Sequence, residues 1–173
     1  MSVPSRLVAL LVLLCSGCAS TPRWPDWVMN PAQDSGPTAA ECAPASGNIS
    51  FDRSRAATLA RASLAQTLEV KVQAMDEAYT EHVSREGGTQ GTASFKATAR
   101  TMVDKVLVNS RVIRTEEYRN PDGRWVCSMV AIGESEARAF AREVVRSSVA
   151  TVSADTEDLL LTRFHAAAPP PKS

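Results

Sequence analysis

The longest stretch of the chain with one clear period runs from Asp52 to Val83 and predicts a single α-helix of roughly 30 residues. Apolar and small side chains recur there every three or four positions, which places them on one side of a helix. Such a helix spans about 45 Å. Its apolar side is too large to remain in water, so it needs a partner surface. The positions predicted to be buried are Ala57, Ala60, Leu64, Leu68, Val72, Met75 and Tyr79, and those predicted to face water are Arg53, Arg61, Gln66, Lys71, Asp76 and Glu77.

The start of this helix is predicted at Asp52, whose carboxylate can accept hydrogen bonds from the first free backbone N–H groups as an N-cap. A short edge strand is predicted just before it, over residues 49–51. The alanines on the apolar side of the helix allow a close approach, either of the chain's own sheet or of another protomer. The first interpretation is favoured.

The partner surface is predicted to be a β-hairpin further along the chain. Residues 108–118 and 124–132 are rich in β-type side chains, and Asn120-Pro121-Asp122-Gly123 lies between them. Proline pre-sets φ for the first turn position, and glycine takes the left-handed position at the end. The pattern therefore predicts an antiparallel hairpin. The second strand has apolar side chains on both faces, so it is expected to be covered on one face and paired or oligomerised on the other.

Three further helical segments are predicted around this hairpin. Helical spacing of apolar residues indicates one helix over residues 94–107, a second that begins at Ser135 and reaches Val149, and a short third over residues 157–164. Together these elements predict one α+β domain, in which helices pack on one face of a small antiparallel sheet.

The composition and the residue spacing argue against nucleic-acid binding and against catalysis. The 173 residues include 19 basic and 19 acidic groups, so no excess of positive charge is available for phosphates. The two histidines, His82 and His165, have no convergent metal-ligand pattern around them. Glu116 and Glu117 are adjacent on a predicted strand and point to opposite faces, so they form no acid/base pair. The chain is therefore predicted to be non-enzymatic, without a metal or cofactor.

The N-terminus is predicted to direct export. Arg6 precedes an apolar run over residues 7–14, which is too short to span a bilayer and is typical of a secretory signal. The next residues, CSGC at 15–18, resemble the bacterial lipobox. The resemblance implies cleavage after Gly17 and acylation of Cys18 with fatty acids such as palmitate. The alternative is an ordinary signal peptide with an incidental cysteine.

The chain is accordingly divided into a signal peptide (1–17), a lipidated cysteine with a flexible tether (18–48), the α+β domain (49–165) and a disordered tail (166–173). An acyl chain would hold the domain on a membrane surface. Ala19 after the lipidated cysteine favours the outer membrane, by analogy with known lipoprotein sorting, so the domain is expected on its periplasmic face. Trp24 and Trp27 in the tether are open to two interpretations: anchors at the lipid headgroups, or side chains that pack on the domain.

Two cysteines, Cys42 and Cys127, remain after the signal peptide and the lipid site are set aside. Two thiols in an oxidising compartment suggest a disulfide. The alternative is a pair of free cysteines, one of them buried in a strand, because sequence alone does not show that the two approach each other.

The order of these features resembles the FlgP-like family of small bacterial outer-membrane lipoproteins. The resemblance covers roughly residues 49–150. It lies in the small-residue pattern of residues 57–65, ATLARASLA, and in the turn with its following aromatic, Asp122-Gly123-Arg124-Trp125. It implies a compact α+β domain and a role at the outer membrane, often in rings around the flagellum. One departure is the segment at residues 48–51, which is short and poor in glycine.

Three functions are therefore considered. The first is a lipid-anchored structural or assembly module that binds other envelope proteins or itself, with a possible flagellar association. The second is a periplasmic module that binds peptidoglycan or a small ligand, and the third is a periplasmic enzyme of an unrecognised type. An exposed apolar strip would favour the first function, and a polar pocket would favour the other two.

Overall fold

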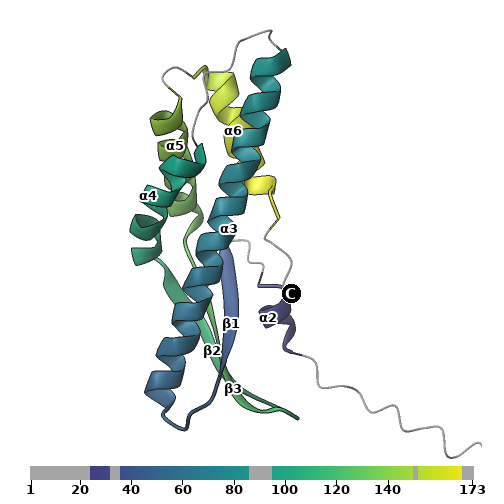
Figure 1. Cartoon of the computed structure of the whole chain (residues 1–173), viewed down its shortest axis with the longest axis vertical. Coiled ribbons are helices and arrows are strands. Elements are labelled where there is room, and N and C mark those ends of the chain that lie inside the picture. Colours follow the sequence, from purple (N-terminus) through teal and green to yellow (C-terminus); the bar gives the residue numbers. More distant parts are fainter. Residues whose placement is uncertain (1–23, 32–35, 86–94, 150–151, 169–173) are drawn as a thin grey trace, which may run out of the picture.

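The computed structural model describes residues 24–31, 36–85, 95–149 and 152–168. It has an α+β fold in which a three-stranded antiparallel sheet packs against one long helix, with further helices beside it (Figure 1). The predicted fold class is confirmed. The elements in chain order are α2 (Asp26–Met29), β1 (Thr38–Pro44), α3 (Ile49–Arg85), α4 (Phe95–Val108), β2 (Arg111–Asn120), β3 (Gly123–Ala131), α5 (Glu134–Ser148) and α6 (Ala154–Ala166).

The predicted hairpin is confirmed as β2 and β3, joined by the two residues Pro121 and Asp122. Gly123 has a φ of 134°, a backbone conformation that favours glycine at this point of the turn. The strand order is β1-β3-β2, so β3 is the central strand. Its central position explains why both of its faces are apolar: Val126 and Cys127 point to opposite faces, and both are fully buried.

The third strand, β1, lies where the sequence predicted a tether, so the tether over residues 18–48 is wrong for residues 38–44. The segment TAAECAP has almost none of the β-branched residues that mark a strand. Its small side chains are needed because α3 crosses this strand closely, and Ala39 and Ala43 are buried beneath it. The edge strand predicted over residues 49–51 is also wrong, because these residues form the first turn of α3.

The start of α3 differs from the prediction at one further point, since Asp52 is not its N-cap. The backbone N–H of Phe51 donates to Asn48 Oδ1 at 3.2 Å, so Asn48 caps the helix. Asp52 instead accepts from the preceding loop, from the Ser46 N–H at 3.0 Å and the Ser46 hydroxyl at 2.7 Å. The carboxylate therefore ties the end of β1 to the first turn of α3.

The hydrogen bonds to Asp52 predict that the connection between β1 and α3 loses stability in acid. Those from the Ser46 hydroxyl and N–H lower the pKa of Asp52 below its ordinary value of 3.8. A carboxyl whose pKa is lower in the folded state stabilises the fold above its unfolded pKa, and that stability is lost as the pH falls through the folded value. We therefore expect the free energy of unfolding to fall more steeply below about pH 4 in the native chain than in Asp52→Asn. Urea denaturation at a series of pH values tests this, and parallel curves for the two proteins would contradict it.

Most of the predicted apolar side of α3 is buried, and Tyr79 is half-buried against the core. Lys71 was predicted to face water, and this is wrong, because only 8% of it is exposed. Its ammonium group donates to the carbonyl oxygens of Phe164 at 3.1 Å and Ala167 at 2.6 Å. The carbonyls at a helix C-terminus have no partners within the helix and carry partial negative charge, so Lys71 fixes the end of α6 to α3. Burial lowers the pKa of Lys71.

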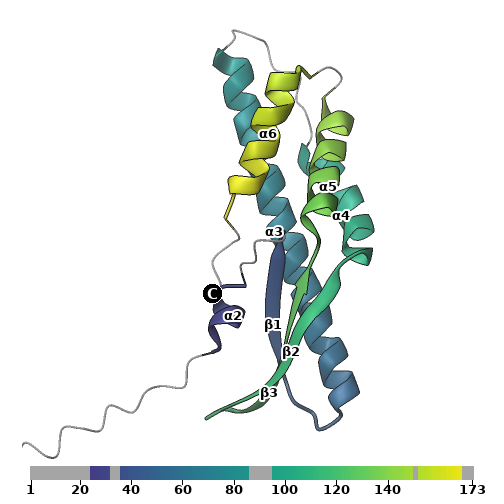
Figure 2. The ribbon, with the colours of Figure 1, turned by 180° about the vertical axis from the view of Figure 1, so that it is seen from behind.

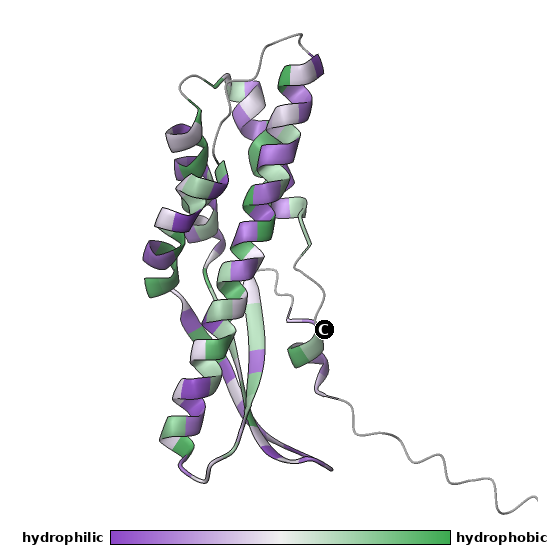
Figure 3. Cartoon of the chain, in the orientation of Figure 1, coloured by the Kyte–Doolittle hydropathy of each residue, from purple (hydrophilic) through white to green (hydrophobic). Residues whose placement is uncertain are grey.

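The sheet and the shorter helices lie along different parts of α3. The sheet lies against the N-terminal part of this helix, α4 and α6 pack further along it, and α5 packs on α4 and α6 (Figures 1 and 2). Apolar and polar residues alternate along these helices (Figure 3), and their buried apolar residues join those of α3 and β3 in one cluster. Its largest fully buried side chains are Phe95, Phe164, Leu64, Leu68, Met75, Ile132 and Leu160.

The three shorter helices confirm the predicted segments with shifted ends. Ser135 is not the cap of α5, which begins at Glu134 after Gly133 without a side-chain cap. The last helix is longer than predicted, because Ser153 accepts a hydrogen bond from the Thr156 N–H and starts α6 at Ala154. Ala166 belongs to this helix and not to a tail. Residues 169–173 lie outside the described residues.

Candidate functional site

The face of the sheet that points away from α3 is covered by the N-terminal segment, residues 24–31. Figure 1 shows α2 on the opposite side of the sheet from α3, next to β1. Val28 of α2 is buried, with 5% of its surface exposed. The strand residues on this face, which we call the outer face, are Ala40, Cys42 and Pro44 of β1, Trp125, Cys127 and Met129 of β3, and Arg114, Glu116 and Tyr118 of β2.

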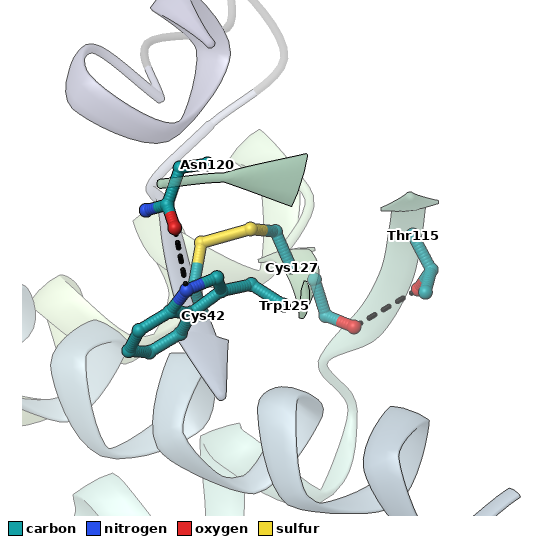
Figure 4. The surroundings of a disulfide bond; sticks show 6 residues. Cys42, Thr115, Asn120, Trp125 and Cys127 are labelled. Atoms are coloured by element: carbon teal, nitrogen blue, oxygen red, sulfur yellow. Dashed lines mark hydrogen bonds between the residues drawn. A yellow bond between two sulfur atoms is a disulfide. The ribbon is translucent and has the colours of Figure 1, made fainter. Parts of the chain in front are cut away.

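Three aromatic side chains meet at the hairpin end of the outer face. Tyr118 and Trp125 are direct partners across β2 and β3. Trp24 lies on both, with its ring centroid 5.4 Å from that of Tyr118 and 5.3 Å from that of Trp125. The Trp125 indole N–H donates to Asn120 Oδ1 at 3.1 Å (Figure 4). Aromatic pairs of this kind contribute about 0.5–1.5 kcal/mol each beyond the burial of their area.

A second contact holds Trp27 to the same face. The guanidinium carbon of Arg114 lies 4.7 Å from the centroid of the Trp27 ring, within the range of a cation–π interaction. Arg114 is in turn oriented by Glu116, at 2.7 Å. Of the two interpretations of Trp24 and Trp27, the structure therefore shows packing on the domain. Together with β1, these contacts extend the domain well to the N-terminal side of the predicted boundary at residue 49.

The outer face also holds a disulfide between Cys42 and Cys127 (Figure 4). The two cysteines are direct partners in the register of β1 and β3, with Cα atoms 4.0 Å apart. On the opposite face, which points toward α3, the hydroxyls of Thr115 and Ser128 share a hydrogen bond of 2.9 Å between β2 and β3. The central strand is therefore tied to one neighbour covalently and to the other through side chains as well as through its ladder. The predicted lipid site, Cys18, lies outside the described residues.

Each histidine has a structural partner. His82 Nε2 lies 3.2 Å from the Thr156 hydroxyl, which links α3 to α6, and His165 Nδ1 lies 2.6 Å from the Leu161 carbonyl oxygen. Within the described part of the chain, no three His, Cys, Asp or Glu side chains are grouped so that they could hold a metal. Among the same residues, no helix is long and apolar enough to cross a membrane.

Glu116 and Glu117 lie on opposite faces of β2 and belong to separate ion pairs. Glu116 pairs with Arg114 at 2.7 Å, and Glu117 pairs with Arg124 at 3.4 Å. All four side chains are about half exposed, so each ion pair is worth little for stability.

An open groove of about 570 Å³ lies between α5 and α6. Arg138 and Arg142 are one helical turn apart on its wall, and each already has a carboxylate partner, Glu134 at 2.7 Å and Glu157 at 3.6 Å. The groove would suit a small anionic group, but its cations are largely neutralised. The residues that line it are Arg138, Arg142, Asp158, Leu161, Thr162, His165 and Ala166.

The aromatic cluster was not predicted, although the sequence of the hairpin contains a signal for it. In a hairpin with a two-residue turn at Pro121 and Asp122, the register is fixed, so Tyr118 and Trp125 must be neighbours on one face. Such a pair predicts an aromatic surface, although not which segment covers it. No protein-family model, no curated protein and no solved structure matches this chain.

Proposed function

We propose that the chain is a non-enzymatic lipoprotein of the bacterial envelope, anchored through Cys18 in the outer membrane, whose domain binds other envelope proteins. The observation that supports this best is the disulfide between Cys42 and Cys127. Disulfides of this structural kind persist in oxidising compartments such as the periplasm and are rare in a reducing cytosol. The bridge therefore fits the export signal and the lipobox of the sequence.

The role as an interaction module is supported by the exposure of β2. No other described strand pairs with its outer edge. Val112 and Ile113 on this strand are 44% and 46% exposed, and Val108 just before it is 83% exposed. An open strand edge with apolar side chains is a surface to which another polypeptide can add by backbone pairing. A flagellar association rests only on the resemblance to the FlgP-like family.

Replacing Cys18 with alanine is expected to abolish lipidation and to release nearly all of the protein from the membrane fraction. The reason is that the acyl chains on Cys18 are the only hydrophobic anchor proposed for the mature protein, and the variant lacks them. Incorporation of labelled palmitate and separation of the inner and outer membranes measure both effects. Cys15→Ala is the matched control, since Cys15 is predicted to leave with the signal peptide. Continued residence of Cys18→Ala in the outer membrane would contradict the proposed anchor.

The flagellar part of the proposal is tested separately, by deleting the gene and scoring motility together with leakage of periplasmic enzymes. Loss of motility with an intact outer membrane supports a flagellar role. Leakage with normal motility supports a general role in the envelope and excludes the flagellar one. Restoring the deletion strain with the native chain or with Cys18→Ala then shows whether either role needs the anchor.

A further inference from the structure

We infer that the outer face of the sheet, at its hairpin end, is held against the bilayer surface by a linker of only a few residues. The inference rests on the proposed acylation of Cys18. It follows from where the folded domain begins. Trp24 is packed on the sheet, and it is only six residues beyond Cys18 in the chain.

The reach of the linker is limited by backbone geometry. A fully extended chain spans at most about 3.6 Å for each residue, so Cys18 and Trp24 are at most about 22 Å apart, whatever conformation the residues between them adopt. With a domain that begins at Ile49, as the sequence predicted, the limit would be roughly 110 Å. The packed N-terminal segment thus shortens the possible distance between membrane and domain about fivefold.

Several independent contacts keep this segment on the sheet. Trp24 packs on Tyr118 and Trp125, and Val28 is buried against the outer face. The Thr38 hydroxyl donates to the carbonyl oxygen of Pro31, which joins the end of the segment to β1. Because these contacts are spread over the whole of residues 24–31, loss of one would not free the segment.

The position of Trp24 also determines which end of the domain lies nearest the bilayer. Its partners Tyr118 and Trp125 are two residues from the hairpin turn. Arg119 and Arg124 face each other at the same end, on the opposite face of the hairpin, and both are exposed. Arg124 is paired with Glu117 at 3.4 Å. At the end of the domain nearest the bilayer, the exposed guanidinium of Arg119 can meet the phosphates of anionic headgroups. The far ends of α3, α5 and α6 lie at the opposite end of the molecule (Figure 1) and are available to partners in the periplasm.

The chain contains its own reporter for this arrangement. All three of its tryptophans, Trp24, Trp27 and Trp125, lie on the outer face. The experiment uses the full lipidated protein in vesicles of phosphatidylethanolamine and phosphatidylglycerol that contain a dansyl-labelled phosphatidylethanolamine. Energy transfer from tryptophan to dansyl reports how near the outer face lies to the headgroups.

We expect strong transfer in the native protein and a severalfold loss when twenty Gly/Ser residues are inserted between Ser20 and Thr21. A flexible segment of that length has an average end-to-end distance of about 25 Å. The matched control has the same insert between Ala168 and Pro169 and should behave as the native chain. Equal transfer in all three proteins, with each floating with the vesicles, would overturn the inference. A native protein that does not float with the vesicles would instead contradict the lipid anchor of the proposed function.

Discussion

Replacing Leu68 with aspartate is expected to unfold the domain under conditions in which the native chain is folded. Leu68 lies in the middle of α3 and is fully buried in the cluster that joins α3, α4, β3, α5 and α6. Truncation of a buried leucine costs about 2–5 kcal/mol, and a carboxylate without a partner adds to that cost. We expect a total loss of at least about 4 kcal/mol, which is comparable to the whole stability of many domains.

Leu59→Asp is the matched control for this substitution. Leu59 is on the same helix, but it is 41% exposed, so the new carboxylate remains hydrated. Its effect should be within about 1 kcal/mol. Thermal and urea denaturation followed by circular dichroism compare the two variants with the native chain. If Leu68→Asp has the same unfolding midpoint as Leu59→Asp, the side of α3 assigned to the core is not buried in solution.

The contrast between these leucines shows what the sequence could predict about the fold. Periodicity identified α3 and placed Leu64 and Leu68 correctly, because a side that repeats every three or four residues has only one way to be buried. The turn residues identified the hairpin, because the sequence around Gly123 fits few other backbone conformations. Both signals are local, and both are confirmed.

The features that the sequence did not predict depend on contacts between distant segments. Strand β1 is composed of small residues that suit the close approach of α3, and a propensity scale records them as poor strand formers. Lys71 is buried because the carbonyls at the end of α6 accept its hydrogen bonds, and those lie more than ninety residues further along the chain. The position of Trp24 could not be predicted either, because its partners Tyr118 and Trp125 are distant in the sequence. For the candidate site, the sequence therefore supplied the aromatic residues and the cysteines but not their common face.

Removing the disulfide with the double substitution Cys42→Ser and Cys127→Ser is expected to lower the free energy of unfolding by up to about 4–5 kcal/mol. The bridge closes a loop with a sequence separation of 85, and in the chain-entropy model this is the stability that such a loop supplies by restricting the unfolded chain. It also joins β1, which contains few residues that favour a strand, to the central strand β3. The double substitution should therefore loosen β1, and with it the segment of residues 24–31 that packs beside it.

Two measurements test this expectation together. Urea denaturation gives the change in stability, and reductant should lower the midpoint of the native chain while leaving that of the double variant unchanged. Maleimide labelling gives the state of the thiols: neither cysteine should react before reduction, and Cys127, which is fully buried, should react only once the chain is also unfolded. Immediate labelling of both cysteines in the exported protein would show that the bridge does not form in the cell. The principal support for a periplasmic location would then be lost, although the sheet register that brings the two cysteines together could still hold.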